Sequence, residues 1–314
     1  MTTRARTRGG LAGAPGVAYL LAALVLVFAI AGSGFASVPN LLNIGVQSSI
    51  LLLLALPMTL IIMSQGLDLS AGAVLGLAGV ALALVLAHGG GLPAAAGAAL
   101  AVGALFGLLN GVLVVRLGIP PFVATLGTLG IAHGAALVAT GGQSVSGLGR
   151  ALPALYASTW LGVPFSIVVA AGAYLVFHVL LYHTRFGVSV FALGGNPEAL
   201  SLAGVRAPLH HAGVYLAGGL MAGFAALLLT GRMNAGHPTA AIGMEFDAIA
   251  AVIVGGTSFE RGNGWLPGTV LGVLTVGVLR NGLNVLAVPS SLQVAGIGVL
   301  VIVALLIDSL RGTR

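Results

Sequence analysis

Hydrophobic runs of about twenty residues recur along the whole chain, separated by short segments that contain glycine, proline and most of the charged residues. A run of this length can cross about 30 Å of hydrocarbon as a helix. Of the 314 residues, 58% are hydrophobic and only 6% are charged, whereas soluble domains average about 25% charged residues. So few charged groups cannot cover a water-facing surface. The sequence therefore predicts an all-α polytopic membrane protein.

Ten segments qualify as candidate transmembrane helices, and we predict about ten spans, with a range of 8–10. The eighth contains only about 12 residues, or about 18 Å of helix, and is expected to be re-entrant or a half-helix inside the bundle. We predict a tail over residues 1–16 and a single membrane domain over 17–310. The candidate segments are 17–34, 42–64, 69–87, 94–116, 122–140, 164–183, 212–231, 246–257, 265–286 and 291–309.

The basic residues are all arginines, and their distribution orients the predicted bundle. With the N-terminus inside, two of them fall outside (Arg150 and Arg232) and Arg280 falls within a span. Cytoplasmic loops carry the basic excess in membrane proteins, so both termini are predicted to be cytoplasmic. The remaining arginines then fall on the cytoplasmic side: Arg4, Arg6, Arg8, Arg116, Arg185, Arg206, Arg261, Arg311 and Arg314.

The same composition excludes several classes of function. The scattered arginines form no basic cluster beyond the first eight residues, so we expect no nucleic-acid partner. The absence of cysteine excludes disulfides and thiolate sites. The apolar run after the first arginines resembles a secretory signal, but more spans follow, and we expect it to be retained as the first span.

A short helix with clear start and stop signals is predicted within the polar segment 184–211. Asn196 suits the N-cap, Pro197 the first helical position, and Glu198 the positive end of the helix dipole. Gly204 suits the left-handed position after the helix. The helix leaves apolar surface that requires a protein partner or the bilayer, contributed by Ala199, Leu200, Leu202 and Ala203.

Polar residues inside the predicted spans are candidates for a solute pathway. Asp68 and Asp247 each begin a helix of small residues after a break, so we expect N-capping, with solute contact, gating or proton coupling as alternatives. Buried amides and hydroxyls can equally bond neighbouring helices. The further candidates are Asn110, Thr125, His133, Asn281 and Asn284.

Two parts of the chain resemble each other weakly. Asp68 opens the segment DLSAGAVLGLAGV and Asp247 opens DAIAAVIVGG, and an Asn-Gly pair follows each, at 110–111 and 281–282. The two copies lie five spans apart and would be inverted in the membrane, which is a common plan of transporters. The residues alone leave open whether this is an inverted repeat or a chance similarity.

No pattern in the sequence predicts chemistry on this chain. The histidines lack metal-ligand spacing with acidic residues, and we predict no metal site. The glycines of 255–264 lack the lysine of a phosphate-binding loop, so we predict no nucleotide site. No nucleophile or acid–base pair is recognisable in the spans, so we predict no catalytic residues and no enzyme.

Five segments resemble one family in order and cover most of residues 35–308: the permease subunits of bacterial ribose, xylose, galactose and arabinose ATP-binding-cassette (ABC) importers. The match between Glu198, Ala199 and Gly204 and the E-A-A-x-x-x-G loop of that family implies docking onto an ATPase subunit. Leu200 departs from the second alanine of that loop, and Gln65 stands where the family often has glycine. The segments are GLDLSAGAVLGLAGV (66–80), NGVLVVRLGIPPFVATLGTLGIAHGAALV (110–138), RFGVSVFALGGNPEALSLAG (185–204), EFDAIAAVIVGGTSFERGNGWLPGTVLG (245–272) and NGLNVLAVPS (281–290).

The resemblance implies the pore of an importer for a small polar solute such as a monosaccharide, in the bacterial inner membrane. Its partners would be an ABC ATPase, which uses ATP and magnesium, a solute-binding protein meeting 141–163, a second permease and membrane lipid. The chain itself would bind no cofactor. An ion-coupled secondary transporter that uses Asp68 or Asp247 is the alternative. The implied coupling residues are Gly195, Asn196, Glu198, Ala199, Leu200 and Gly204.

Overall fold

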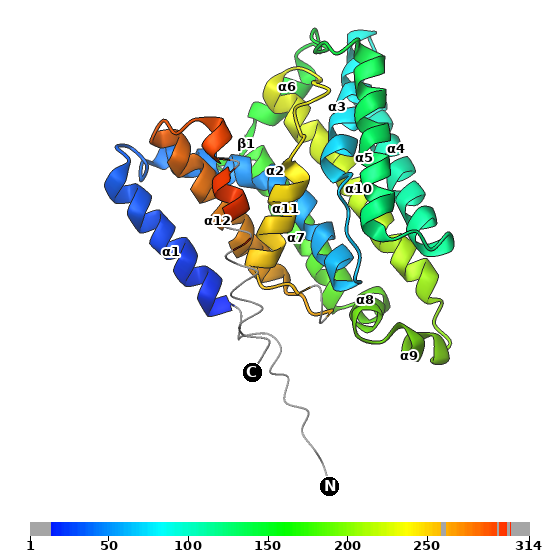
Figure 1. Cartoon of the computed structure of the whole chain (residues 1–314). Coiled ribbons are helices and arrows are strands. Elements are labelled where there is room, and N and C mark those ends of the chain that lie inside the picture. Colours follow the sequence, from blue (N-terminus) through cyan, green and yellow to red (C-terminus); the bar gives the residue numbers. More distant parts are fainter. Residues whose placement is uncertain (1–13, 259–261, 294, 300–301, 303–314) are drawn as a thin grey trace.

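The structure is a computed structural model that describes residues 14–258, 262–293, 295–299 and 302. Its labelled elements are almost entirely helical, and long helices pack side by side (Figure 1). This confirms the predicted all-α polytopic class. The elements are α1 (Ala14–Ala31), α2 (Val38–Met63), α3 (Ala71–Ala87), α4 (Leu92–Gly111), the π-helical η1 (Val112–Arg116), α5 (Pro121–Thr140), α6 (Ala151–Ala157), β1 (Thr159–Trp160), β2 (Val163–Pro164), α7 (Phe165–Tyr182), α8 (Arg185–Gly195), α9 (Pro197–Leu202), α10 (Ala207–Met233), α11 (Met244–Val254) and α12 (Leu266–Val285).

Six helices in the described part of the chain are long and apolar enough to cross a membrane: α2, α4 with η1, α5, α7, α10 and α12. The shorter helices α1, α3 and α11 match the first, third and eighth predicted spans. The tenth, 291–309, extends outside the described residues. The predicted number of ten spans is therefore not confirmed. Arg4, Arg6, Arg8, Arg261, Arg311, Arg314 and most of the predicted tail also lie outside the described residues.

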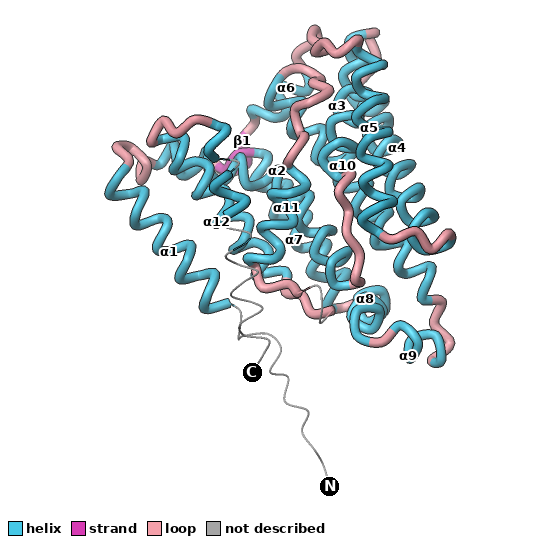
Figure 2. The backbone as a smooth tube through the Cα atoms, viewed as in Figure 1, coloured by secondary structure: helices cyan, strands magenta, loops and turns pink. Residues whose placement is uncertain are grey.

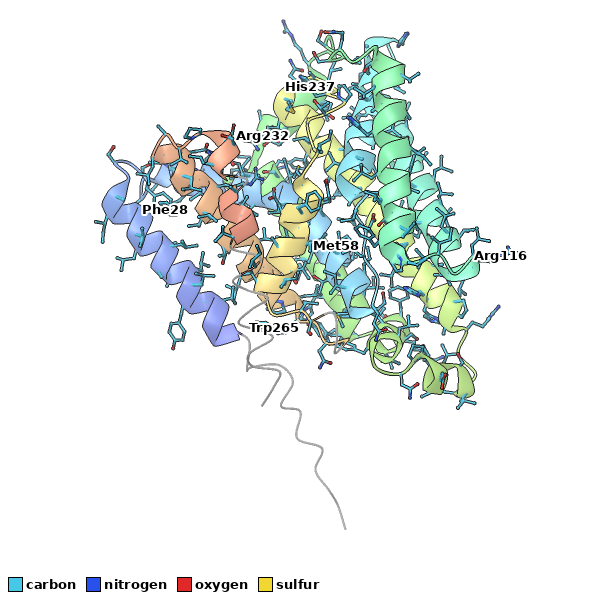
Figure 3. All side chains as sticks on the ribbon, viewed as in Figure 1. Phe28, Met58, Arg116, Arg232, His237 and Trp265 are labelled. Atoms are coloured by element: carbon cyan, nitrogen blue, oxygen red, sulfur yellow. The ribbon has the colours of Figure 1, made fainter. Side chains whose placement is uncertain are left out.

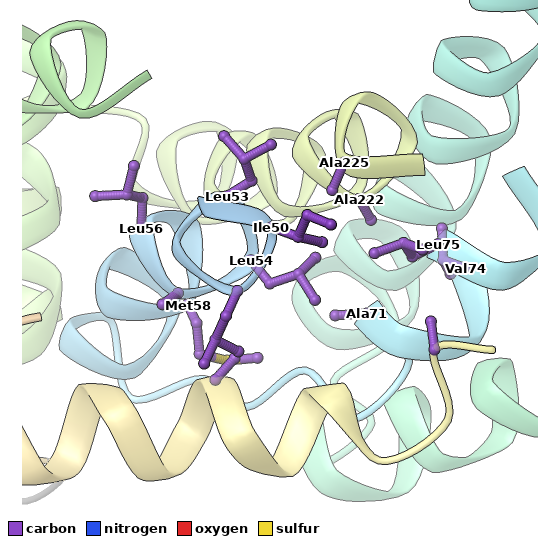
Figure 4. Packing of buried hydrophobic residues seen from close by; sticks show 14 of the residues in the cluster. Ile50, Leu53, Leu54, Leu56, Met58, Ala71, Val74, Leu75, Ala222 and Ala225 are labelled. Carbon is purple, nitrogen blue, oxygen red and sulfur yellow. The ribbon is translucent and has the colours of Figure 1, made fainter. Parts of the chain in front are cut away.

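Helix α2 forms the centre of the bundle. Every residue from Ser48 to Met63 is buried, because α7, α10, α11 and α12 pack around it. A helix that is apolar on all sides is expected in such an interior position. Figure 4 shows its leucines packed against Val74 and Leu75 of α3 and against two alanines of α10.

Two helices begin inside the bundle after stretches of non-helical chain (Figure 2). The segment 64–70 leads from the end of α2 to α3, which has 17 residues, and 234–243 leads from α10 to α11, which has 11. The two beginnings are adjacent, because a Cβ atom placed on Gly72 of α3 would meet the Glu245 carboxylate of α11. The eighth span, expected to be re-entrant or a half-helix, is a short helix that begins inside the bundle. The break expected before the helix of Asp68 is confirmed as the non-helical stretch 64–70.

Glycines allow α4 and α10 to pack with their backbones in contact. Gly103 and Gly107 on α4 face Gly219 and Gly223 on α10, and each helix presents the pair at a spacing of four residues. A Cβ on Gly103 would meet the Gly219 carbonyl oxygen. Small residues at this spacing are the usual means of close helix packing in membranes.

The packing partners support an inverted repeat. Helix α4 packs against α3 and α10, and α12 packs against α11 and α2. The order of long helix, non-helical chain, half-helix and long helix therefore occurs twice, as α2–α3–α4 and as α10–α11–α12. The last helix of each copy packs against the first helix of the other copy. The half-helices α3 and α11 extend toward opposite ends of the bundle (Figure 1).

The two polar segments lie at opposite ends of the bundle. Helices α8 and α9 occupy one end and α6 the other (Figure 1), which agrees with the sequence-based placement of 184–211 and 141–163 on opposite sides. Arg232 and His237 lie toward the α6 end, whereas Trp265 lies toward the α8–α9 end (Figure 3). The predicted polar loop 184–211 is largely helical, because it forms α8, α9 and the first turn of α10.

Candidate functional site

A buried polar network joins the beginning of α3 to α4 and α5. The Asp68 carboxylate accepts hydrogen bonds from the backbone N–H and the hydroxyl of Ser70, at 2.8 and 2.6 Å. The Ser70 hydroxyl accepts from the Asn110 amide at 2.8 Å, and the Asn110 carbonyl oxygen accepts from Thr128 at 2.7 Å. Thr125 bonds the Pro121 carbonyl oxygen of its own helix. The network thus ties three helices together around one carboxylate.

The beginning of α11 carries two further buried carboxylates. Both carboxylate oxygens of Glu245 accept from the Gly243 backbone N–H, at 3.0 and 3.1 Å. Asp247 forms an ion pair with Arg280 of α12, with 2.6 Å between Oδ2 and Nη2. Carboxylates near a helix N-terminus interact favourably with its dipole. The beginnings of both half-helices therefore place buried carboxyl groups inside the bundle.

The prediction that Asp68 and Asp247 are N-cap residues is wrong, because each lies a few residues away from the N-cap of its helix. The N-cap residues are Ser70 for α3 and Gly243 for α11. Asp68 instead orders the turn before its helix, and Asp247 lies within the first turn of its helix, where Arg280 from α12 pairs with it.

Asn281 follows Arg280 on α12, but its side chain bonds a residue outside both half-helices. Its side chain exchanges two hydrogen bonds with Asn40, at 2.8 and 2.9 Å, and so joins α12 to the start of α2. Asn284 accepts from Gln293. The structure therefore brings Asp68, Asn110 and Thr125 together, and holds Asp247 and Asn281 in separate contacts. Their role in a pathway stays a prediction.

Sequence reasoning did not find four of the residues in these contacts. Ser70 and Thr128 complete the network around Asp68, Glu245 begins α11, and Arg280 pairs with Asp247. The spacing Asp68-x-Ser70 is the local signal that could have indicated the first of them, since Asp often bonds the backbone two residues on. An arginine inside a span is the signal for the last, since such a charge requires a partner.

The network is closed to solvent in this conformation. Asp68, Ser70, Asn110 and Thr128 are all buried. A cavity of about 500 Å³ lies between α2, α7 and α12, but its lining is almost entirely apolar and includes none of the predicted pathway residues. A polar solute requires hydrogen-bonding groups in its site, so this cavity does not fit such a solute.

The local structure predicted around Glu198 is confirmed. Asn196 is the N-cap of α9 and accepts from the Ala199 backbone N–H at 3.0 Å, and Pro197 is the first helical residue. Gly204 has a φ of +77°, the left-handed conformation that glycine adopts without steric cost. The Gly204 and Val205 N–H groups bond carbonyl oxygens of α9, which completes a Schellman ending.

Helix α9 presents one face to the bundle and the other to its surroundings. Glu198 and Ala199 are exposed, and Leu202 is 89% exposed. Leu200 is only 7% exposed and packs with Leu193 and Ala207. The expectation that Leu200 contributes to an outward apolar surface is therefore wrong, because its side chain anchors α9 to α8 and α10.

Comparisons with known proteins agree with this architecture. The family model described as "Branched-chain amino acid transport system / permease component" matches residues 40–305. The ribose import permease protein RbsC of Escherichia coli K12 is 36% identical over 305 residues, which cover 92% of each chain. The D-allose transport system permease protein AlsC of the same strain is 35% identical, covering 94% of this chain and 91% of the relative.

A third relative, the galactose/methyl galactoside import permease protein MglC of Haemophilus influenzae, is 33% identical over 88% of both chains. No solved structure matches the chain. The family model covers most of the sequence, and the relatives are similar along nearly their whole length. The chain therefore belongs to the family of multi-pass membrane permease components that includes these ABC import permeases.

Proposed function

We propose that the chain is the permease of an ABC importer for a monosaccharide or a closely related polar compound. The observation that carries this proposal is the similarity to ribose, D-allose and galactose permeases at 33–36% identity, over about nine-tenths of the chain. A branched-chain amino acid, which the description of the family model names, is the alternative solute. Uptake assays with the two solute classes distinguish these possibilities.

Helix α9 supplies the contact with a partner ATPase in this proposal. Its exposed residues Glu198 and Ala199 lie at the end of the bundle, and Leu200 holds the helix to the membrane domain. A helix that is anchored on one face and exposed on the other can transmit movement of a partner to the bundle. ATP and magnesium would be used by that partner, and this chain would bind neither.

The α8–α9 end is cytoplasmic in this proposal, and the α6 end meets a solute-binding protein. Arg185 begins α8 and Arg206 lies between α9 and α10, whereas Arg150 directly precedes α6 and Arg232 lies toward the α6 end (Figure 3). Cytoplasmic loops carry the basic excess in membrane proteins, and the sequence-based count places that excess on the side of 184–211. The exposed Trp160 and Leu161, in the hairpin at the α6 end, offer apolar contact area.

A second permease, identical or related, completes the pore in this proposal. The polar networks of the described residues are buried within one chain, and the cavity of about 500 Å³ is apolar. A polar passage between two permeases is consistent with both facts. Alternating access would then follow from a shift between two conformations that ATP binding and solute binding favour differently.

Reversal of the charge at Glu198 tests the docking role. Glu198→Arg replaces a favourable interaction with the α9 dipole by an unfavourable one and places a cation at the proposed contact. We expect the variant to insert into the membrane but to lose co-purification with the ATPase. Gln143→Arg, an exposed change at the α6 end, is the matched control and should retain the ATPase. Retention by Glu198→Arg would show that another segment makes the contact.

A further inference from the structure

Gln65 adopts a backbone conformation that side chains rarely tolerate. It follows the end of α2 with a φ of +60°. Its N–H donates to the Ile62 carbonyl oxygen at 3.0 Å, and the Gly66 N–H donates to the Ile61 carbonyl oxygen at 2.8 Å. These two bonds form a Schellman ending, in which the left-handed position is usually glycine. A glutamine there indicates that its side chain has a use.

The Gln65 side chain connects the end of α2 to the segment that holds α9. Its amide Nε2 donates to the Gly194 carbonyl oxygen at 3.0 Å. Gly194 lies in the last turn of α8, two residues before the N-cap Asn196 of α9. The contact is between residues 129 positions apart, so it is a tertiary link and not part of the local turn.

Backbone packing around Gly194 makes this link stiff. A Cβ atom on Gly194 would meet the Met63 carbonyl oxygen and the backbone of Gly262. The ends of α2 and α8 and the chain after α11 therefore touch through main-chain atoms, with no flexible side chain between them. Displacement of the α8–α9 junction must displace the end of α2 or break the Gln65 hydrogen bond.

From Gln65 the chain leads directly to the buried network at the beginning of α3. Only Gly66 and Leu67 separate it from Asp68, which orders Ser70 and through it contacts Asn110. We propose that Gln65 is a positioning residue that transmits movement of α9 to the 64–70 segment and the network of Asp68. This inference rests on the proposed function, since it assigns a route for coupling between the ATPase contact and the bundle interior.

Substitutions at Gln65 separate coupling from stability. Gln65→Gly removes the donor and relieves the unfavourable φ, so the variant should fold at least as well as the wild type. Gln65→Ala removes the donor and keeps the unfavourable φ. Gln65→Asn keeps an amide and tolerates a positive φ, but its shorter side chain should not reach Gly194. Gln143→Ala, at the opposite end, is the control.

The assay reconstitutes the permease in liposomes with its ATPase and binding protein and uses radiolabelled D-ribose as the probe. We expect all three Gln65 variants to assemble and hydrolyse ATP, with the ratio of D-ribose transported to ATP hydrolysed lowered by about fivefold, the effect of one neutral hydrogen bond. The control should keep the wild-type ratio. A role in stability alone would leave the ratio unchanged in Gln65→Gly.

The outcomes distinguish this inference from the proposed function. If the wild-type complex shows ATP-driven uptake and Gln65→Gly and Gln65→Asn keep its ratio, the role of Gln65 is refuted and the proposed function stands. If the wild-type complex takes up sugar without ATP, or takes up none of D-ribose, D-allose and D-galactose, the result contradicts the proposed function itself.

Discussion

A methyl group added at Gly219 would separate α4 from α10, because the space it requires is occupied by backbone. In the structure a Cβ at this position would meet the Gly103 carbonyl oxygen, and would lie 2.7 Å from the nitrogen and 2.8 Å from the Cα of Gly107. These atoms belong to helical main chain and cannot rotate away. Relief requires the helices to move apart by about 1 Å, because non-bonded heavy atoms lie about 3.5 Å apart at contact. Overpacking of this kind costs about 1–3 kcal/mol.

The free energy of unfolding measured by SDS titration in mixed micelles tests this estimate. Gly97→Ala is the matched control, because it lies on α4 and a Cβ there meets nothing within 4 Å. Alanine favours helix over glycine by about 1 kcal/mol, so the control should be neutral or more stable. Gly219→Ala should unfold at lower SDS. Equal unfolding midpoints for the two variants would refute the close packing of α4 on α10.

Two further contacts give testable consequences. Asp247→Asn leaves Arg280 without its charged partner, so we expect the free energy of unfolding in the same SDS titration to fall by about 2 kcal/mol. Arg280→Gln should cost a similar amount, and the double variant should cost less than the sum of the two. Additive effects would exclude a direct interaction between the two side chains. Asn196→Ala removes the N-cap bond of α9, which is worth about 1 kcal/mol. Amide hydrogens of Glu198–Leu202 should then exchange about fivefold faster, and unchanged exchange relative to Ser201→Ala would contradict the capping role.

Structural features that depend only on neighbouring residues, such as helix positions and helix ends, could be predicted. Apolar run length located the helices, and the signals from Asn196 to Gly204 predicted the start and end of α9, because capping depends on neighbouring residues. The short length of the eighth span indicated a re-entrant segment or a half-helix, and α11 is a short helix of 11 residues. The break before α3 was also predicted from Gly66 and Asp68, although Leu67 and Leu69 keep the hydropathy high through this non-helical stretch.

Contacts between distant segments could not be predicted. Nothing in the sequence near Asp247 indicates Arg280, and nothing near Leu200 indicates that its side chain turns toward α8 and α10. Gln65 was recognised only as a departure from the family pattern. Its contact could be identified only from the fold, which places the Gly194 carbonyl oxygen within hydrogen-bonding distance of the Gln65 amide.

Uptake of radiolabelled D-ribose into proteoliposomes tests the central claim most directly. The permease is reconstituted alone, and in parallel with its ATPase and binding protein, with and without ATP and an ionophore. The account predicts uptake only in the complete complex with ATP, unaffected by the ionophore. Uptake by the permease alone, or uptake that the ionophore abolishes, would contradict it and favour ion-coupled transport.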